Sequence, residues 1–194
     1  GKISAIAKGA RKPTSKFGGR LEVFGFNDYL LGTGKSLYVV SQVETIESFY
    51  SLREDEKVLK AASFIAKLTN QCLEDEHKNI PLFELLLESL RALKEKGNPK
   101  AVQIAFEFRL MDIEGFIPYL DGCVKCKKNI TKEPAKVNLN LNVGGLVCSS
   151  CSKTVVGGSI VPFKLIKQVK YLKTKPFHAI KELKIIDEDL ANLE

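Results

Sequence analysis

The first 47 residues alternate weakly between apolar and polar positions, the period of two that is typical of β-strands. Alternation over residues 2–8 predicts a first strand, and the apolar residues between 21 and 26 predict a second. The β-branched and aromatic run over residues 36–46 predicts the third and clearest one. A loop of glycine, lysine, arginine and serine, residues 9–19, separates the first two. A basic loop between strands suits the rim of a barrel better than its core.

From about residue 52 the apolar positions recur every three to four residues, which predicts amphipathic helices. The first helix has one apolar face between Val58 and Cys72, and the second opens at Pro81 and is apolar over much of its girth. A third starts at Pro99 and is stopped by Gly115. Helices this apolar predict a compact helical domain. The third is expected to bury Val102, Phe106, Leu110 and Ile113.

A cysteine-rich segment, residues 123–158, interrupts the helical pattern, which resumes from about 162 to 172 and from about 178 to the end. A β-hairpin is expected within it, over residues 137–143. The pattern as a whole predicts an α+β protein of several parts. These are a β domain over residues 1–48, a helical domain over 49–122 that continues at 159–194, and the cysteine-rich module between them.

Positive charge is concentrated toward the two ends of the chain. The net charge is +7, residues 1–20 hold six basic residues and no acid, and residues 124–175 hold eleven lysines against the single acid Glu133. Such basic stretches favour a polyanion as partner, because lysine and arginine release counterions from phosphates. Ordinary solvated surface is the alternative interpretation. The candidate DNA contacts in the first stretch are Lys2, Lys8, Arg11, Lys12, Lys16 and Arg20.

Aromatic residues near the basic loop allow a further contact. Phe17 or Tyr38 could stack on a nucleobase. Phe17 is equally well explained as a core residue at the edge of a strand, and the sequence leaves the two interpretations open.

Four cysteines form the most specific motif in the chain. Cys123 and Cys126 make one CxxC pair, and after 21 residues Cys148 and Cys151 make a second. Two such pairs can place four thiolates around one Zn²⁺ at about 2.3 Å each, leaving no open position, so the metal is expected to be structural. Two disulfides or a redox CxxC are the alternatives. The chain opens without an export leader, which disfavours disulfides.

The remaining reactive residue types suggest no catalysis. Cys72 is interpreted as an inert buried thiol on the apolar face of a helix, and His77 as a solvated surface residue. The Gly-Thr-Gly-Lys-Ser segment at 32–36 lacks the first glycine of a P-loop and leads into a strand, so it is interpreted as a hairpin turn. No catalytic triad or paired carboxylates stand out. We expect a protein that is not an enzyme and that, without a long apolar run, has no membrane partner.

Residues 1–19 resemble the start of the bacterial RecO family of recombination mediators almost word for word. Further matches occur in the family's order, at residues 51–55, 82–87, 106–110 and 115–120, and at the two CxxC pairs. The resemblance covers most of residues 1–165. Members of the family usually have about two strands before the position of Gly1 and a last helix after that of Glu194.

The resemblance implies an N-terminal OB-fold, present here as a partial β-barrel, and an all-helical domain that carries a four-cysteine zinc finger. It implies a mediator that binds single- and double-stranded DNA without sequence preference, anneals complementary strands coated with single-strand-binding protein, and loads the recombinase RecA together with RecR. The bacterial cytoplasm, at the nucleoid, is the expected location. The residues alone leave open a zinc-ribbon accessory factor of transcription or translation and, as the weakest alternative, an enzyme acting on nucleic acid.

Overall fold

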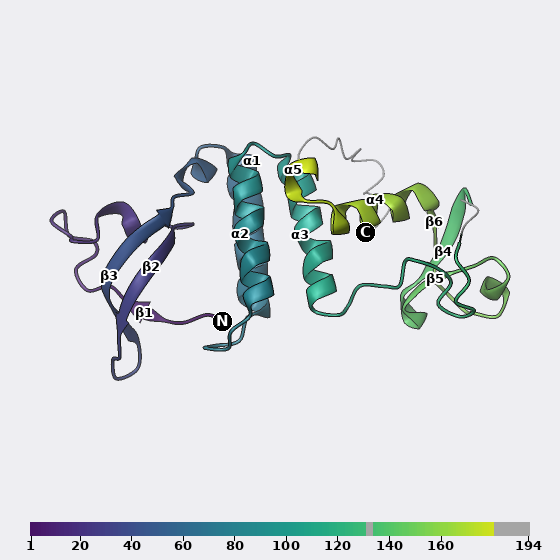
Figure 1. Ribbon diagram of the computed structural model, residues 1–194, viewed down its shortest axis with the longest axis horizontal. Coiled ribbons are helices and arrows are strands. Elements are labelled where there is room, and N and C mark those ends of the chain that lie inside the picture. The colour runs from purple at the N-terminus through teal and green to yellow at the C-terminus, as the bar shows by residue number, and fades with distance from the viewer. Residues whose placement is uncertain (131–133, 181–194) are drawn as a thin grey trace. The chain divides into compact units, whose positions relative to one another are not determined.

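The computed structural model describes residues 1–130 and 134–180 (Figure 1). The chain divides into two compact units, Gly1–Pro99 and Lys100–Glu194, and each is described here by itself. The described residues form five α-helices and two three-stranded sheets, and neither of these sheets closes into a barrel. The mixed α+β class expected from the sequence is confirmed.

The first unit opens with an open sheet of strand order β1-β3-β2. Its strands are β1 (Ala5–Ile6), β2 (Phe26–Gly32) and β3 (Tyr38–Glu47). β2 and β3 form an antiparallel hairpin, and β1 runs parallel to β3. Residues 33–37 connect the hairpin strands, so the Gly-Thr-Gly-Lys-Ser segment is the turn that the sequence predicted.

The second strand begins later than predicted. Gly18–Leu21 form a 3-10 turn, and the amide of Gly25 donates to the carbonyl of Glu22 at 3.2 Å. Phe24 adopts a positive φ of 66°, which an extended strand does not allow. The apolar character that suggested a strand has another role, because Leu21 packs against the small core beneath the basic loop. That core comprises Phe17, Val40 and Val43, with Ala7, Ala10 and Leu31 beside it.

Two helices complete the first unit and lie side by side (Figure 1): α1 (Glu56–Cys72) and α2 (Ile80–Lys94). The side chain of Asp55 caps α1 by accepting from the amides of the next turn, and Asn79 caps α2 in the same way. The predicted apolar faces are buried at most positions, and Val58, Leu68 and Leu86 are half-buried. Cys72 is also only half-buried, contrary to expectation. The buried apolar residues are Ala61, Ala62, Ile65, Leu82, Leu85, Leu90, Ala92 and Leu93, together with Leu52 of the 3-10 turn Tyr50–Arg53.

In the second unit, α3 (Pro99–Ile113) ends just before Gly115, whose φ of +75° breaks the helix as predicted. The expected apolar residues of this helix are buried except Ile113, which is 39% exposed because it lies in the last turn. α4 (Phe163–Thr174) and α5 (Phe177–Ile180) follow later in the chain. The predicted helical segment beyond residue 180 lies outside the described residues.

A second sheet, of order β5-β4-β6, precedes α4. Its strands are β4 (Lys136–Asn140), β5 (Gly145–Val147) and β6 (Ser159–Pro162), all antiparallel to their neighbours. β4 and β5 form a hairpin around the 3-10 turn Leu141–Val143, and its second strand lies beyond the predicted range of 137–143. One face of this sheet packs on α4. We call residues 119–162, apart from the undescribed 131–133, the cysteine module; its core with α4 comprises Val137, Leu146, Val161, Leu165 and Ile166.

Candidate metal centre and basic loop

Each CxxC pair lies on a tight backbone turn. In the first, the amide of Lys127 donates to the carbonyl of Cys123 at 2.9 Å, and the amide of Cys123 donates back to Lys128 at 2.9 Å. In the second, the amide of Ser152 donates to the carbonyl of Cys148 at 2.8 Å, ahead of the 3-10 turn Cys151–Lys153. These turns direct both thiols of a pair to the same side.

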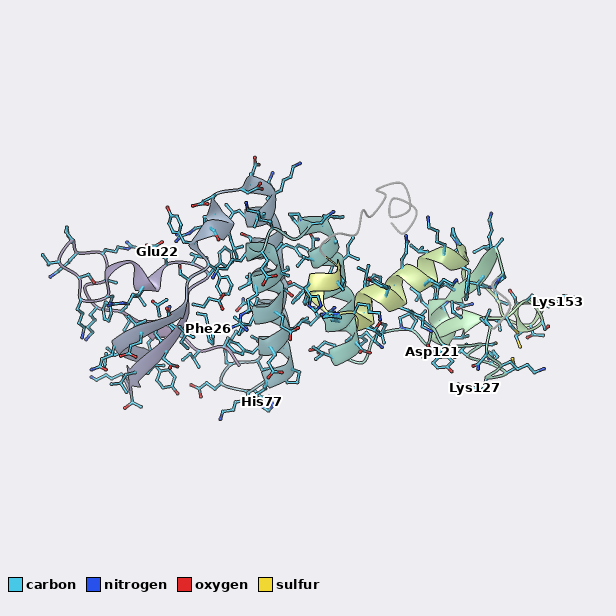
Figure 2. All side chains as sticks on the ribbon, turned by 45° about the horizontal axis from the view of Figure 1, so that its top comes forward. Glu22, Phe26, His77, Asp121, Lys127 and Lys153 are labelled. Carbon is cyan, nitrogen blue, oxygen red and sulfur yellow. The ribbon has the colours of Figure 1, made fainter. Side chains whose placement is uncertain are left out.

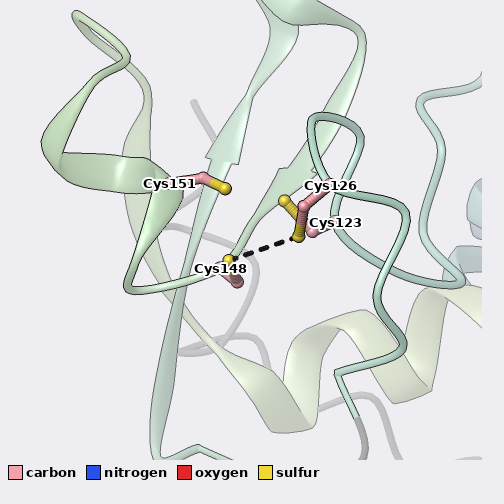
Figure 3. A group of neighbouring side chains, drawn as sticks. All are labelled: Cys123, Cys126, Cys148 and Cys151. Carbon is pink, nitrogen blue, oxygen red and sulfur yellow. Dashed lines mark hydrogen bonds between the residues drawn. The ribbon is translucent and has the colours of Figure 1, made fainter.

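The four thiols converge on one point, as Figure 3 shows. Their sulfur atoms all lie within 4.8 Å of one another, and Sγ of Cys126 lies 3.9 Å from Sγ of Cys148. Tetrahedral bonds of about 2.3 Å to one ion require sulfurs roughly 3.8 Å apart, so the spacing fits a metal ion. All four cysteines are free, which favours a metal cluster over two disulfides. The cluster therefore could hold a metal.

The thiols differ in burial and in acidity. Burial alone would raise the pKa of the Cys123 thiol, but hydrogen bonds from the backbone amides of Cys126, Cys148 and Lys125 outweigh it and lower the pKa to about 6. The pKa of Cys151 is raised to about 12, chiefly by hydrogen bonds with the thiols of Cys148 and Cys126. Backbone amides thus stabilise the thiolate of Cys123, while the neighbouring sulfurs oppose the deprotonation of Cys151. A cation bound between the four sulfurs would offset the repulsion between thiolates.

Backbone hydrogen bonds hold the two CxxC turns together independently of any metal. The amide of Leu146 donates to the carbonyl of Tyr119 at 3.0 Å, and the amide of Tyr119 donates to Gly144 at 2.8 Å. The amide of Val124 donates to Leu146 at 2.8 Å. The segment that leads into the first pair is therefore fastened to β5, which leads into the second. A Cβ at Gly145 would approach the carbonyl oxygen of Tyr119 to 2.4 Å, so this contact requires glycine.

The basic loop of the first unit, residues 8–20, is a series of backbone turns, and the buried side chain of Phe17 anchors it to the sheet. Amides of Lys12, Ser15 and Gly18 each donate to the carbonyl three residues earlier, at 2.9–3.2 Å. Phe17 is 2% exposed and belongs to the core with Val40, so its interpretation as a core residue is the correct one. Tyr38 instead donates from its hydroxyl to Oε1 of Glu76 at 3.1 Å.

The six candidate DNA contacts fall into three groups. Lys8, Arg11 and Lys12 are exposed and form no ion pair with a described residue. Nζ of Lys16 donates to the carbonyl of Ser41 at 2.8 Å, and Arg20 donates to the carbonyl of Lys16. Lys2 lies apart from the loop. Its ammonium group is 4.0 Å from Asp75 and donates to the carbonyl of Asn70.

Three lysines that were not among the predicted DNA contacts surround a groove of about 810 Å³ in the cysteine module. The excess of lysine over residues 124–175 predicted a positively charged region, but not which of these lysines line the same groove. They come from three different segments, Lys128 after the first CxxC pair, Lys136 on β4 and Lys153 after the second pair. Only the fold brings them together. His77, by contrast, is exposed as predicted.

Comparison with known proteins identifies the family. The family model for the N-terminal part of recombination protein O matches residues 1–49, and that for its C-terminal part matches residues 53–194. The DNA repair protein RecO of Alkaliphilus metalliredigens is 34% identical over 186 residues, which are 95% of this chain and 74% of that relative. RecO of Dehalococcoides mccartyi strain BAV1 is 31% identical over 195 residues, which cover 100% of this chain and 76% of the length of that relative.

No helix among the described residues has both the length and the apolar content to span a bilayer. The two family models together account for nearly all of the sequence, and both name the same protein. This chain therefore belongs to the RecO family of DNA repair proteins.

Proposed function

We propose that this protein is a non-enzymatic mediator of recombinational DNA repair that binds single- and double-stranded DNA without sequence preference. It anneals complementary strands coated with single-strand-binding protein and, with RecR, helps to load RecA, at the nucleoid of the bacterial cytoplasm. Its β domain over residues 1–48 belongs to an OB-fold, and the helical domain carries the module of residues 123–158. Membership in a family of DNA repair proteins supports this proposal.

The exposed basic loop is the observation that carries the proposal. Lys8, Arg11 and Lys12 form no ion pair with a described residue, so their charge is available to phosphates. Glycines and serines between them leave room for a phosphate line to approach. Contacts of this kind read charge and not base edges, which accounts for binding without sequence preference. Lys2, Lys16 and Arg20 are proposed as further contacts of the same site.

We also propose that the metal is a structural Zn²⁺ held by Cys123, Cys126, Cys148 and Cys151. Soft thiolates in a tetrahedral set select zinc over magnesium or calcium, and four protein ligands leave no position for a substrate. In this role the ion shapes the module and takes no part in chemistry. Metal analysis of the purified protein should give one zinc per chain, and a value near zero with free thiols would contradict the assignment.

A salt titration of DNA binding tests the main proposal. Anisotropy of a labelled oligothymidylate should give a log–log slope of roughly −4 from six phosphate contacts. The loop variant Lys8→Gln/Arg11→Gln/Lys12→Gln should lower the magnitude of the slope by about 2 and slow the annealing of coated strands. The matched control is Lys57→Gln/Lys67→Gln/Lys78→Gln, which removes the same charge from exposed lysines of α1 and the loop after it.

Failure of the wild-type protein to bind DNA at low ionic strength would refute the proposal. Strong preference for one sequence over a scrambled one would favour the accessory factor of transcription or translation. Turnover of the nucleic acid by purified protein would favour an enzyme.

A further inference from the structure

The groove in the cysteine module lies on the face of the β5-β4-β6 sheet that points away from α4. Strand pairing fixes this: Asn138 of β4 is flanked by Val147 of β5 and Ile160 of β6 in one cross-strand row. Side chains in such a row share a face, and alternate residues such as Val137 and Val161 point to the opposite face, into the core with α4. The row forms the floor of the groove.

Polar side chains hold one wall of the groove in place. Nδ2 of Asn138 donates to Oγ of Ser152 at 2.9 Å, and Nδ2 of Asn140 donates to the carbonyl of Val156 at 3.2 Å. Gly158 has a φ of +94°, and a Cβ there would meet Oδ1 of Asn138 at 2.1 Å. Because both asparagines are buried, these bonds fasten the segment after the second CxxC pair across the sheet.

The charged residues that line the groove, among those the structure describes, are all lysines. Lys128, Lys136 and Lys153 line it, all three are exposed, and no acidic residue is among the described residues that line it. None of the three forms an ion pair with any described residue, whereas Lys170 and Lys173 of α4 lie 2.5 Å and 2.7 Å from aspartate carboxylates. Lys153 projects at the outer end of the module (Figure 2). Within residues 1–130 and 134–180, the charge of the groove lysines is therefore not neutralised by an acidic partner.

The uncharged lining adds hydrogen-bond donors. Ser149 and Ser150 are exposed on the second CxxC turn, and Asn129 follows the first. Lysine ammonium groups with serine hydroxyls and amides are the side chains that contact phosphate oxygens and sugars. No aromatic residue is among the described residues that line the groove, so it offers no platform for stacking a base.

We propose that this groove binds the phosphodiester backbone of a nucleic-acid strand, as a second site on a different unit from the basic loop. This inference rests on the DNA binding proposed above and adds a second place where a strand is held. One protein molecule could then hold two strands, or two parts of one strand. Both cysteine turns carry rim residues and Cys148 itself lines the groove, so the cysteine cluster holds the groove in shape.

The test compares three triple variants that each remove three positive charges. The groove variant Lys128→Gln/Lys136→Gln/Lys153→Gln stands beside the loop variant and the α1 control variant described above. Each is titrated with labelled oligothymidylate at several salt concentrations, after metal content and thermal unfolding have been shown to match the wild type. The six contacts of the first site contribute roughly −4 and three groove contacts add roughly −2, so the wild-type slope should be roughly −6. The groove variant should lower its magnitude by about 2, and combining it with the loop variant should lower it by about 4.

The outcomes separate the inference from the proposed function. If the groove variant behaves like the α1 control while the loop variant weakens binding, the inference is wrong and the proposed function stands. If wild-type protein does not bind at low salt, the proposed function itself fails. Binding of a polyglutamate peptide tests the alternative that the groove binds an acidic protein segment and not a nucleic acid. If the groove variant loses affinity for that peptide but keeps its affinity for DNA, the groove is an acidic-protein site and the inference is overturned.

Discussion

The two small sheets of this protein hold exposed lysine and arginine in place by different physical means. The β1-β3-β2 sheet supports the basic loop through one buried ring, Phe17, packed on Val40 and Val43. The β5-β4-β6 sheet supports its lysines through two cysteine turns, buried asparagines and a core shared with α4. Each sheet has only three strands and one small buried cluster, and in each a further anchor adds to the stability that the cluster provides. The anchors predict different sensitivities.

Metal removal should have the largest effect, and only on the second sheet. Structural zinc contributes on the order of 10 kcal/mol to small modules at neutral pH. Chelation should therefore raise amide hydrogen exchange over residues 120–130 and 144–154, while exchange in β2 and β3 stays unchanged. Hydrogen exchange with mass spectrometry provides the measurement. Equal loss of protection from exchange in both sheets would show that the two sheets do not depend on different anchors.

Phe17→Ala should destabilise the first sheet by about 3 kcal/mol, because it removes the largest side chain of a three-residue buried cluster. The basic loop would lose its anchor, so affinity for DNA should fall although no charge has changed. Metal content should remain that of the wild type. Chemical unfolding is the measurement, with Phe116→Ala as the control, since that ring is 78% exposed and its loss should cost little.

Gly145→Ala should destabilise the cysteine module by about 2 kcal/mol, because the added methyl group would collide with the carbonyl of Tyr119. The change leaves all four cysteines in place, so it separates the backbone anchor from the metal anchor. The control is Gly19→Ala, where nothing lies within 4 Å of the new Cβ. Similar thermal unfolding of the two variants would show that the backbone contact is dispensable.

The smallest effect concerns the end of β3, where Glu47 is 2.8 Å from Nε of Arg91 and 3.0 Å from Nζ of Lys94. Burial works to raise the pKa of this carboxyl group, but hydrogen bonds from Arg91 and Lys94 outweigh it and lower the pKa. Since the folded pKa lies below the unfolded value, the stabilisation is complete above the unfolded pKa of about 4.3 and is lost as the pH falls through the folded one.

Glu47→Gln should therefore cost about 1 kcal/mol at pH 7, discounted for the exposure of its partners, and much less near pH 3. Urea unfolding at both pH values provides the measurement. Glu44→Gln, an exposed neighbour on the same strand, serves as the control. A penalty that is the same at both pH values would exclude the ion pairs as its cause.

The parts of the fold that the sequence predicted are those in which the period of burial is long and regular. The apolar faces of α1 and α2 follow directly from local pattern, and so does the pairing of the two CxxC motifs. The hairpin of β4 and β5 was expected from the length of the spacer between those motifs, and only its first strand lies in the predicted range. A strand was wrongly predicted over residues 21–25, because an apolar residue that anchors a turn, such as Leu21, cannot be told by type from one in a strand. The groove was out of reach, since its lysines are at least eight positions apart and meet only through strand register.

The hydrogen bonds that fasten Tyr119 and Val124 to β5 have a consequence for how the cysteine cluster would acquire a metal ion. Chelate affinity depends on how much chain freedom the ligands lose when they gather, and here much of that freedom is already lost before the ion arrives. A free peptide spanning residues 121–153 would have to order itself around the ion. The intact chain should therefore take up zinc more tightly than the peptide and regain its module readily after depletion.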